Sequence, residues 1–160
     1  MIFISLGTQK FQLNRLLEEI DELVKENNIT DKVFAQVGNS SYTPSSYEYA
    51  SFLTQDDFEK KINECDIFIT HGGVGSITTG IKYKKKIIVY PRLAKYNEHV
   101  DDHQLQISTK YHELGLILLA EDKDSLLECI TNVDSFESKE NVLVPSTEKV
   151  VNKIIEFIEG

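Results

Sequence analysis

A glycine-rich segment that opens with a histidine is the part of this sequence best suited to hold an anion. Residues 67–70 form an apolar run typical of a buried strand, HGGVGS follows at 71–76, and a helical pattern opens at Gly75-Ser76. Glycine lets the backbone approach a ligand closely, and a helix N-terminus offers unpaired N–H groups at the positive end of its dipole. The segment therefore predicts a site for a phosphate-bearing ligand at the carboxyl end of a parallel strand.

The glycine spacing separates this segment from three familiar motifs. It lacks the G-x-G-x-x-G of dinucleotide binding, and the next strand ends at Tyr90-Pro91 without the carboxylate that the motif requires. It also lacks the Gly-Lys-Ser/Thr of a P-loop, and the chain has no Gly-x-Ser-x-Gly elbow of an esterase. A cradle for the diphosphate of a nucleotide sugar fits best, with a buried core histidine as the alternative for His71.

Gly7-Thr8-Gln9 follows the first apolar run of the chain, at residues 2–6. The glycine permits close approach of the backbone, and the threonine hydroxyl can hydrogen-bond a phosphate oxygen. An ordinary turn between a strand and a helix explains these residues equally well when they are taken alone. Their expected place beside the glycine-rich segment favours a contribution to the same site.

Polar and titratable side chains are concentrated in a third segment, residues 91–104. Carboxylates and amides bind sugar hydroxyls well, so Glu98, Asp102 and Gln104 are candidate sugar ligands. The alternative is a solvated loop at the start of a helix, whose dipole favours acidic residues.

A metal site is a further alternative for the same segment. His99 and His103 are four residues apart and would share one face of the helix expected over residues 99–113. They do not match the His-Glu-x-x-His pattern of zinc proteases. We expect no metal and no cofactor.

Strand and helix patterns alternate along the whole chain. Apolar runs predict strands over residues 2–6, 33–37, 67–70, 87–90 and 116–119, with a more polar strand over 47–53. Helical spacing predicts helices over residues 11–27, 56–65, 76–84, 99–113, 123–132 and 147–159. The alternation predicts an α/β fold, a single Rossmann-like domain over residues 1–160 with helices on both faces of a parallel sheet.

Composition narrows the class of protein. The 160 residues carry a formal net charge of -9, which argues against a nucleic-acid partner because such proteins need a clustered basic surface. The densest basic run is Lys82, Lys84, Lys85 and Lys86; it is either a solvated helix end or a small cationic patch for anionic lipid or an acidic partner.

The sequence shows no pattern typical of disulfide bonds, of a signal peptide or of a membrane span. Two cysteines, Cys65 and Cys129, indicate reduced thiols rather than a disulfide scaffold or a zinc site. The N-terminal apolar run is too short for a signal peptide, and no run reaches the roughly 20 apolar residues of a membrane span. We therefore expect a soluble protein, or one held at a membrane by a partner.

Taken together, the segments resemble the C-terminal, donor-binding domain of family-28 GT-B glycosyltransferases, the group that includes the peptidoglycan enzyme MurG. The matching elements are LGT at 6–8 with Phe11, THGGVGS at 70–76, Pro91-Arg92, and NEHVDDHQ at 97–104. The chain is most similar to free-standing PssE- and EpsF-type subunits of exopolysaccharide and capsule synthesis. It also resembles the small catalytic subunit of the eukaryotic two-part UDP-GlcNAc transferase.

The resemblance implies a UDP-sugar site, and it assigns residues to each part of the donor. The diphosphate would be faced by Gly7, Thr8, His71, Gly72, Gly73, Gly75 and Ser76. The backbone near Phe52-Leu53 would read the uracil edge, and the hexose would be held by Asp102 and Gln104, with Arg92, Glu98 and His103 nearby. Thr79 stands where many relatives carry a ribose-binding glutamate, and its hydroxyl offers a weaker contact. Candidate catalytic groups are His71 and Glu98, although no base is evident in the chain.

A GT-B enzyme needs two Rossmann-like domains, so the resemblance implies a partner. We expect a membrane-anchored, PssD-type subunit that binds a lipid-linked glycan acceptor. The last helix, residues 147–159, would dock onto that subunit or close the core of this domain. When isolated, the chain could form a homodimer.

The function implied is inverting transfer of a hexose, galactose or glucuronate, from a UDP-sugar in exopolysaccharide or capsule synthesis. The protein would lie in the cytoplasm and be recruited to the inner face of the plasma membrane by its partner. The alternatives are a non-catalytic enhancer or scaffold subunit and a sugar-nucleotide epimerase.

Overall fold

All six strands run parallel in one sheet, in the order β3-β2-β1-β4-β5-β6. The structure is a computed structural model, and it describes residues 1–139. The strands are β1 (Ile2–Ser5), β2 (Val33–Gln36), β3 (Glu48–Ala50), β4 (Ile67–Thr70), β5 (Lys86–Val89) and β6 (Leu118–Leu119). The predicted α/β fold with a parallel sheet is confirmed.

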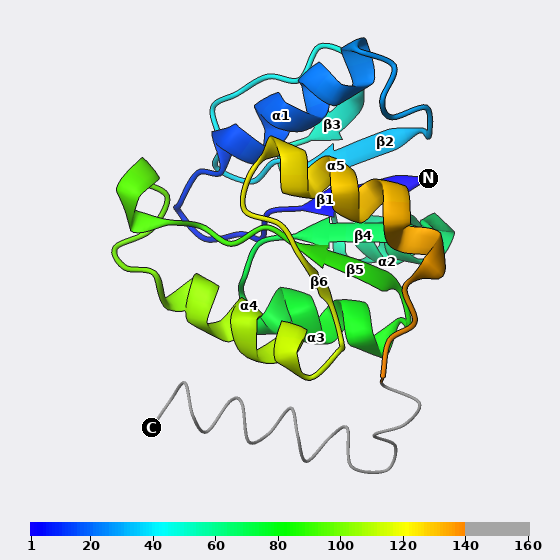
Figure 1. Ribbon diagram of the computed structural model, residues 1–160. Coiled ribbons are helices and arrows are strands. Elements are labelled where there is room, and N and C mark those ends of the chain that lie inside the picture. The colour runs from blue at the N-terminus through cyan, green and yellow to red at the C-terminus, as the bar shows by residue number, and fades with distance from the viewer. Residues whose placement is uncertain (140–160) are drawn as a thin grey trace.

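Helices cover both faces of this sheet. One face is covered by α1 (Asn14–Lys25) and α5 (Lys123–Asn132). The other face is covered by α2 (Gln55–Glu64), α3 (Val74–Lys82) and α4 (His103–Glu113). Figure 1 shows α1 and α5 in front of the sheet and α2 behind it. Two short 3₁₀ turns, η1 (Ala94–Tyr96) and η2 (Val133–Ser135), complete the described elements.

The two faces hold separate apolar cores because side chains of a strand alternate between the faces. In β1, Ile2 and Ile4 pack with α1 and α5, while Phe3 packs on the opposite face. The Phe3 ring lies 5.3 Å from that of Phe58 and 5.7 Å from that of Phe68, measured between centroids. Burial on both faces explains why the central strands read as uninterrupted apolar runs.

Several element boundaries differ from the sequence prediction. Helix α1 begins at Asn14 rather than near residue 11, because Ser40 Oγ and Gln12 Oε1 accept hydrogen bonds from the N–H groups of Leu13 and Asn14. Helix α4 begins at His103 rather than 99, and β3 and β6 are shorter than predicted. The helix predicted over residues 147–159 lies outside the described residues.

Two of the four lysines of the basic run, Lys85 and Lys86, have structural roles. The ammonium of Lys85 donates to the carbonyls of Asn63 and Cys65, at the end of α2. The ammonium of Lys86 donates to the carbonyls of Val133 and Asp134. Such contacts neutralise the carbonyls at helix ends, where the dipole is negative.

None of the helices within residues 1–139 is long and apolar enough to cross a membrane.

Candidate ligand-binding site

A pocket of about 680 Å³ opens at the carboxyl edge of the sheet, where β1 and β4 lie side by side. From β1 the chain turns into α1 on one face, and from β4 it turns into α3 on the other. Ligands of open α/β sheets bind at such a switch point. The pocket is lined by Ser5, Gly7, Thr8, Gln9, Gln36, Leu53, Gln55, Phe58, His71, Gly73, Val74, Gly75, Ser76 and Thr79.

The loops after β1 and β4 approach each other closely at this point. Gly7 has a φ of +74°, and a Cβ there would lie 2.7 Å from Nε2 of His71. A Cβ at Gly73 would lie 2.4 Å from Cε1 of the same ring. The imidazole therefore fills the space between two glycines, and neither position accepts a side chain without displacement.

The N-terminus of α3 points its free N–H groups toward the pocket. The first hydrogen bond of the helix runs from the Ile77 N–H to the Gly73 carbonyl, 3.0 Å apart, and no side chain among residues 1–139 caps this end. The N–H groups of residues 74–76 therefore remain available, at the positive end of the helix dipole. The helix begins at Val74, so Gly75 and Ser76 belong to its first turn rather than opening it as predicted.

His71 is buried, with 6% of its surface exposed. Its Nε2 lies 3.1 Å from the Ser76 hydroxyl oxygen. Burial, together with the positive charge of Arg92, lowers the pKa of His71 to about 3. The imidazole is therefore neutral at ordinary pH, and its Nε2 orders the Ser76 hydroxyl.

Sequence reasoning missed four polar and aromatic residues of the pocket: Ser5, Gln36, Gln55 and Phe58. Gln36, at the end of β2, accepts a hydrogen bond from the Leu53 N–H with its Oε1, at 2.9 Å. Gln55 and Phe58, in α2, line the same end. The available signal was Gln36, a polar residue that ends an apolar strand. Phe52 is half exposed and does not line the pocket, whereas Leu53 does.

Thr79 lines the pocket from the second turn of α3. Its hydroxyl donates to the Gly75 carbonyl at 2.7 Å. The oxygen can still accept a hydrogen bond, but its proton is engaged.

Gln104, Gly72 and Arg92 lie behind the pocket rather than in its wall. The Oε1 of Gln104 accepts hydrogen bonds from the N–H groups of Gly72 and Arg92, both at 3.1 Å. A Cβ at Gly72 would lie 2.6 Å from Ser108 Oγ and 2.7 Å from the Gln104 carbonyl oxygen. These contacts fasten α4 to the loop after β4. The carboxamide oxygen of Gln104, predicted to bind a hexose hydroxyl, is buried and already accepts two backbone hydrogen bonds.

Glu98 also lies outside the pocket, and only 1% of its surface is exposed. Its carboxylate accepts hydrogen bonds from the Arg15 guanidinium and from the Leu93 N–H. As a candidate base or sugar ligand, Glu98 is therefore occupied by structural contacts. Asp102 is exposed and accepts from the Ala94 N–H, and His103 opens α4, half-buried; neither lines the pocket.

The structure does not support the metal alternative. His99 precedes α4, so it does not share a helix face with His103; its ring packs on Phe11 and its Nδ1 lies 3.1 Å from Asp101. Within residues 1–139 no group of three His, Cys, Asp or Glu side chains is arranged to hold a metal ion. The Asp-x-Asp sequence at residues 122–124 serves to cap α5, since Asp122 accepts from the Ser125 N–H at 2.8 Å.

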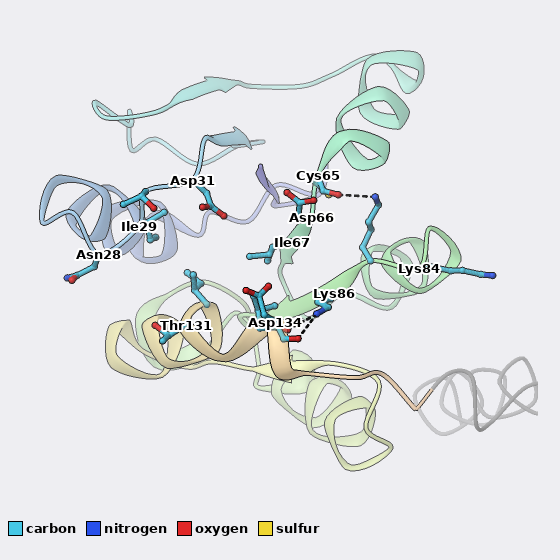
Figure 2. Close-up of a pocket in the computed structure, with 14 residues that line it drawn as sticks. Asn28, Ile29, Asp31, Cys65, Asp66, Ile67, Lys84, Lys86, Thr131 and Asp134 are labelled. Atoms are coloured by element: carbon cyan, nitrogen blue, oxygen red, sulfur yellow. Dashed lines mark hydrogen bonds between the residues drawn. The ribbon is translucent and has the colours of Figure 1, made fainter.

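A second pocket, of about 640 Å³, lies at the opposite, amino edge of the sheet. Asp31, Asp66 and Asp134 line it, and Lys84 points away from the other lining residues (Figure 2). Asp66 pairs with the amino group of Met1 at 2.7 Å, and Lys86 is held by backbone carbonyls. The charges of Asp66 and Lys86 are thus engaged locally. The carboxyl-edge pocket is the candidate site, because ligands of open α/β sheets bind at that edge.

Fold and pocket together define an α/β domain with a pocket at its switch point. The chain belongs to glycosyltransferase family 28: the profile of the family's C-terminal domain matches residues 1–156. A curated relative is the UDP-N-acetylglucosamine transferase subunit ALG13 of Homo sapiens, 25% identical over 122 residues. That match covers 71% of this chain and 10% of ALG13, so the chain spans about a tenth of that relative's length.

Solved structures share the fold. MurG of Acinetobacter baumannii superposes with a TM-score of 0.62 at 17% identity, over 97% of this chain and 49% of the MurG chain. A solution structure of ALG13 superposes with a TM-score of 0.54 at 15% identity, over 84% of this chain and 85% of that one. The chain therefore shares its fold with about half of the MurG chain. The predicted resemblance to the C-terminal domain of family 28 is confirmed by the family match.

Proposed function

We propose that this chain is the donor-binding subunit of a two-component inverting glycosyltransferase that uses a UDP-sugar. The observation that carries the proposal is the set of free N–H groups at residues 74–76, which face a pocket shared with Gly7 and Thr8. Two phosphates of a nucleotide sugar fit between these loops, because backbone N–H groups and a helix N-terminus favour anions. Membership of family 28 supports the same assignment.

The nucleoside would lie at the end formed by Gln36, Leu53 and Phe58. This end combines apolar side chains with a few polar groups, which is typical of sites that hold a flat base. The hexose would extend from the diphosphate toward Asp102 and His103 at the start of α4.

The chemistry would be direct displacement at the anomeric carbon. The acceptor hydroxyl loses its proton and forms the new bond, the bond to the UDP oxygen breaks, and the configuration inverts. Negative charge grows on the leaving diphosphate, where fixed N–H donors stabilise it without reorganisation. The low pKa of His71 makes it a weak base, its Nε2 is engaged by Ser76, and Glu98 is paired with Arg15, so we assign the base to the partner subunit.

A second subunit is part of the proposal. The chain spans about half of the MurG chain, and the name of the relative ALG13 describes a transferase subunit. We propose a membrane-anchored, PssD-type partner that presents a lipid-linked glycan and recruits this chain to the inner face of the plasma membrane. The sugar would be galactose or glucuronate, and the product an exopolysaccharide or a capsule.

One observation favours a second candidate, a non-catalytic enhancer of such a transferase. The Thr79 hydroxyl proton is engaged by Gly75, so Thr79 offers a ribose only a single acceptor. A weakened donor site would be tolerated in a subunit that only stabilises its partner.

Calorimetry with UDP, uridine and pyrophosphate tests the proposal. We expect UDP to bind more tightly than uridine, and pyrophosphate to compete with UDP. GDP serves as a control for the base, since a site of this size at Leu53 should prefer the smaller pyrimidine. Absence of UDP binding, with and without the partner, would exclude the donor-binding role.

Transfer by the reconstituted pair separates the two candidates. Wild-type chain and partner together should release UDP from a UDP-hexose, whereas neither subunit alone should do so. A Ser76→Ala variant should reduce this release while leaving co-purification with the partner intact. Undiminished transfer by a chain that binds no UDP would establish the enhancer role instead.

A further inference from the structure

Arg92 is a buried cation directly behind the pocket. It follows β5 and exposes 1% of its surface. Its Nη2 donates to the carbonyls of Leu6 at 2.8 Å and Phe11 at 3.0 Å, and its Nε donates to that of Gln12 at 3.3 Å. One guanidinium thus holds three carbonyls of the loop between β1 and α1.

The charge of Arg92 has no direct carboxylate partner among the described residues. Glu98 is the carboxylate that acts on it electrostatically, but Glu98 is already paired with Arg15 at 3.0 Å. The Nη1 atom of Arg92 is buried and finds no acceptor within residues 1–139. Burial lowers the pKa of Arg92 to about 10, so the group remains charged at neutral pH. Uncompensated buried charge is costly, and a nearby anion would offset that cost.

Peptide geometry carries the effect of Arg92 into the pocket. In a trans peptide the C=O and the N–H of one unit point in opposite directions. The Leu6 carbonyl points at the guanidinium, so the Gly7 N–H points away from it. Gly7 lines the pocket, and its N–H has no acceptor in the part of the chain that the structure describes.

We propose that Arg92 is a positioning residue for the donor diphosphate. It turns the Leu6–Gly7 peptide so that the Gly7 N–H faces the phosphates, and its buried charge is balanced when the anion binds. It touches no ligand, because it is absent from the pocket wall. The inference rests on the proposed diphosphate site and assigns to Arg92 an indirect role in place of the direct contact predicted from the sequence.

Amide NMR of the full-length chain, with pyrophosphate and UDP as probes, tests the inference. The Gly7 N–H resonance of the wild type should move downfield on titration with either probe. In Arg92→Gln this change in the Gly7 resonance should be lost. UDP affinity should fall about tenfold, whereas uridine affinity should change less than about twofold. Only the phosphate contacts depend on the orientation of the Leu6–Gly7 peptide. Arg92→Lys keeps the positive charge but lacks the planar set of guanidinium N–H donors, so it should recover part of the UDP affinity.

Lys86→Gln is the matched control. Lys86 is likewise a cation that holds backbone carbonyls, at the opposite end of β5, and its loss changes the net charge equally. It should leave the Gly7 response and the ratio of UDP to uridine affinity unchanged. If the ratio of UDP to uridine affinity falls as much in Lys86→Gln as in Arg92→Gln, the effect is one of general charge and the inference is overturned.

The outcomes separate the inference from the function on which it rests. If the wild type binds neither UDP nor pyrophosphate, both fail. If it binds UDP with no response at the Gly7 N–H, or if UDP and uridine affinity fall together in the Arg92 variants, the function stands and the positioning role is excluded. Should Arg92→Gln not fold, Arg92→Lys and the wild-type Gly7 response decide the question in the same way.

Discussion

The Arg15 guanidinium grips the Glu98 carboxylate with two parallel hydrogen bonds, Nε to Oε2 and Nη2 to Oε1, each 3.0 Å long. The Arg15 guanidinium carbon also lies over the rings of Tyr90 and Tyr96, at 4.5 and 4.3 Å from their centroids. This contact fastens the loop after β5 to α1. It also explains why Glu98, acidic and next to the predicted site, is not free to bind a sugar.

Replacing Glu98 should therefore affect stability rather than donor binding. Removal of one partner from a largely buried ion pair leaves the other charge uncompensated, so Glu98→Gln should lower the free energy of unfolding by about 3 kcal/mol. UDP affinity should remain within about twofold of the wild type, a change well below 1 kcal/mol. Urea unfolding and calorimetry measure the two quantities.

Glu113→Gln provides the control for this ion pair. Glu113 pairs with Lys110 at 3.7 Å on the surface, so its loss should cost less than about 1 kcal/mol. If Glu98→Gln has wild-type stability but no longer binds UDP, Glu98 contributes directly to donor binding and the structural role is wrong.

His71 should make the protein less stable as the pH falls. Its folded pKa of about 3 lies below the ordinary value of 6.5, so the unfolded chain takes up the proton first. The contribution is absent above about pH 6.5 and grows as the pH falls toward 3; between pH 7 and pH 5 it amounts to a loss of about 2 kcal/mol.

His71→Gln isolates this effect. The glutamine amide can reach Ser76 but does not titrate, so the variant should lose about 2 kcal/mol less than the wild type over that pH range. Urea unfolding at both pH values gives the difference. Equal pH dependence of the two proteins would mean that His71 is accessible to protons in the folded state.

Gly75→Ala should separate folding from ligand binding. A Cβ at Gly75 meets no atom within 4 Å, and the position lies in the first turn of α3. Stability should be unchanged or increase by up to about 1 kcal/mol, since alanine is the better helix residue. The methyl group would stand among the N–H donors of the pocket, so UDP affinity should fall about tenfold, or about 1.4 kcal/mol.

Gly72→Ala is the comparison for Gly75→Ala, because it should lower the stability of the fold. Its Cβ would press on α4 at Ser108 and Gln104, so stability should fall by about 1–3 kcal/mol. Thermal unfolding and UDP calorimetry of both variants are needed. Wild-type UDP affinity in Gly75→Ala would place the phosphates elsewhere.

Gln36 should control the backbone at the nucleoside end of the pocket. Gln36→Leu removes the acceptor of the Leu53 N–H, so hydrogen exchange at that amide should accelerate and uridine and UDP should bind about fivefold more weakly, the loss of about one hydrogen bond. Gln55→Leu removes a neighbouring amide that, within the described part of the chain, contacts the Glu59 side chain and no backbone group, so the exchange at Leu53 should be unchanged. Equal exchange at Leu53 in Gln36→Leu and the wild type would contradict this role.

Local pattern and general topology were enough to predict the fold, and they point to the edge of the sheet where the structure has a pocket. The apolar runs around Phe3, Phe34 and Phe68 could only be buried strands, and their alternation with amphipathic helices implies a parallel sheet. Because carboxyl ends of parallel strands share one edge, Gly7 and the segment from His71 to Ser76 were expected at that edge. They adjoin because β1 pairs with β4. Glycine spacing and the following helix then predict an anion site without knowledge of any side-chain orientation.

Side-chain direction, by contrast, depends on residues far away in the chain. Glu98 turns inward because the guanidinium of Arg15, 83 residues earlier, donates hydrogen bonds to its carboxylate. Gln104 turns inward because Gly72, without a side chain, leaves room beside its backbone. No local pattern contains these partners. In the same way Gln36 and Phe58 enter the pocket only because β2 and α2 pack beside the switch point. The type and order of the residues therefore predicted an anion site at this edge of the sheet, and packing between distant elements decided which side chains line the pocket.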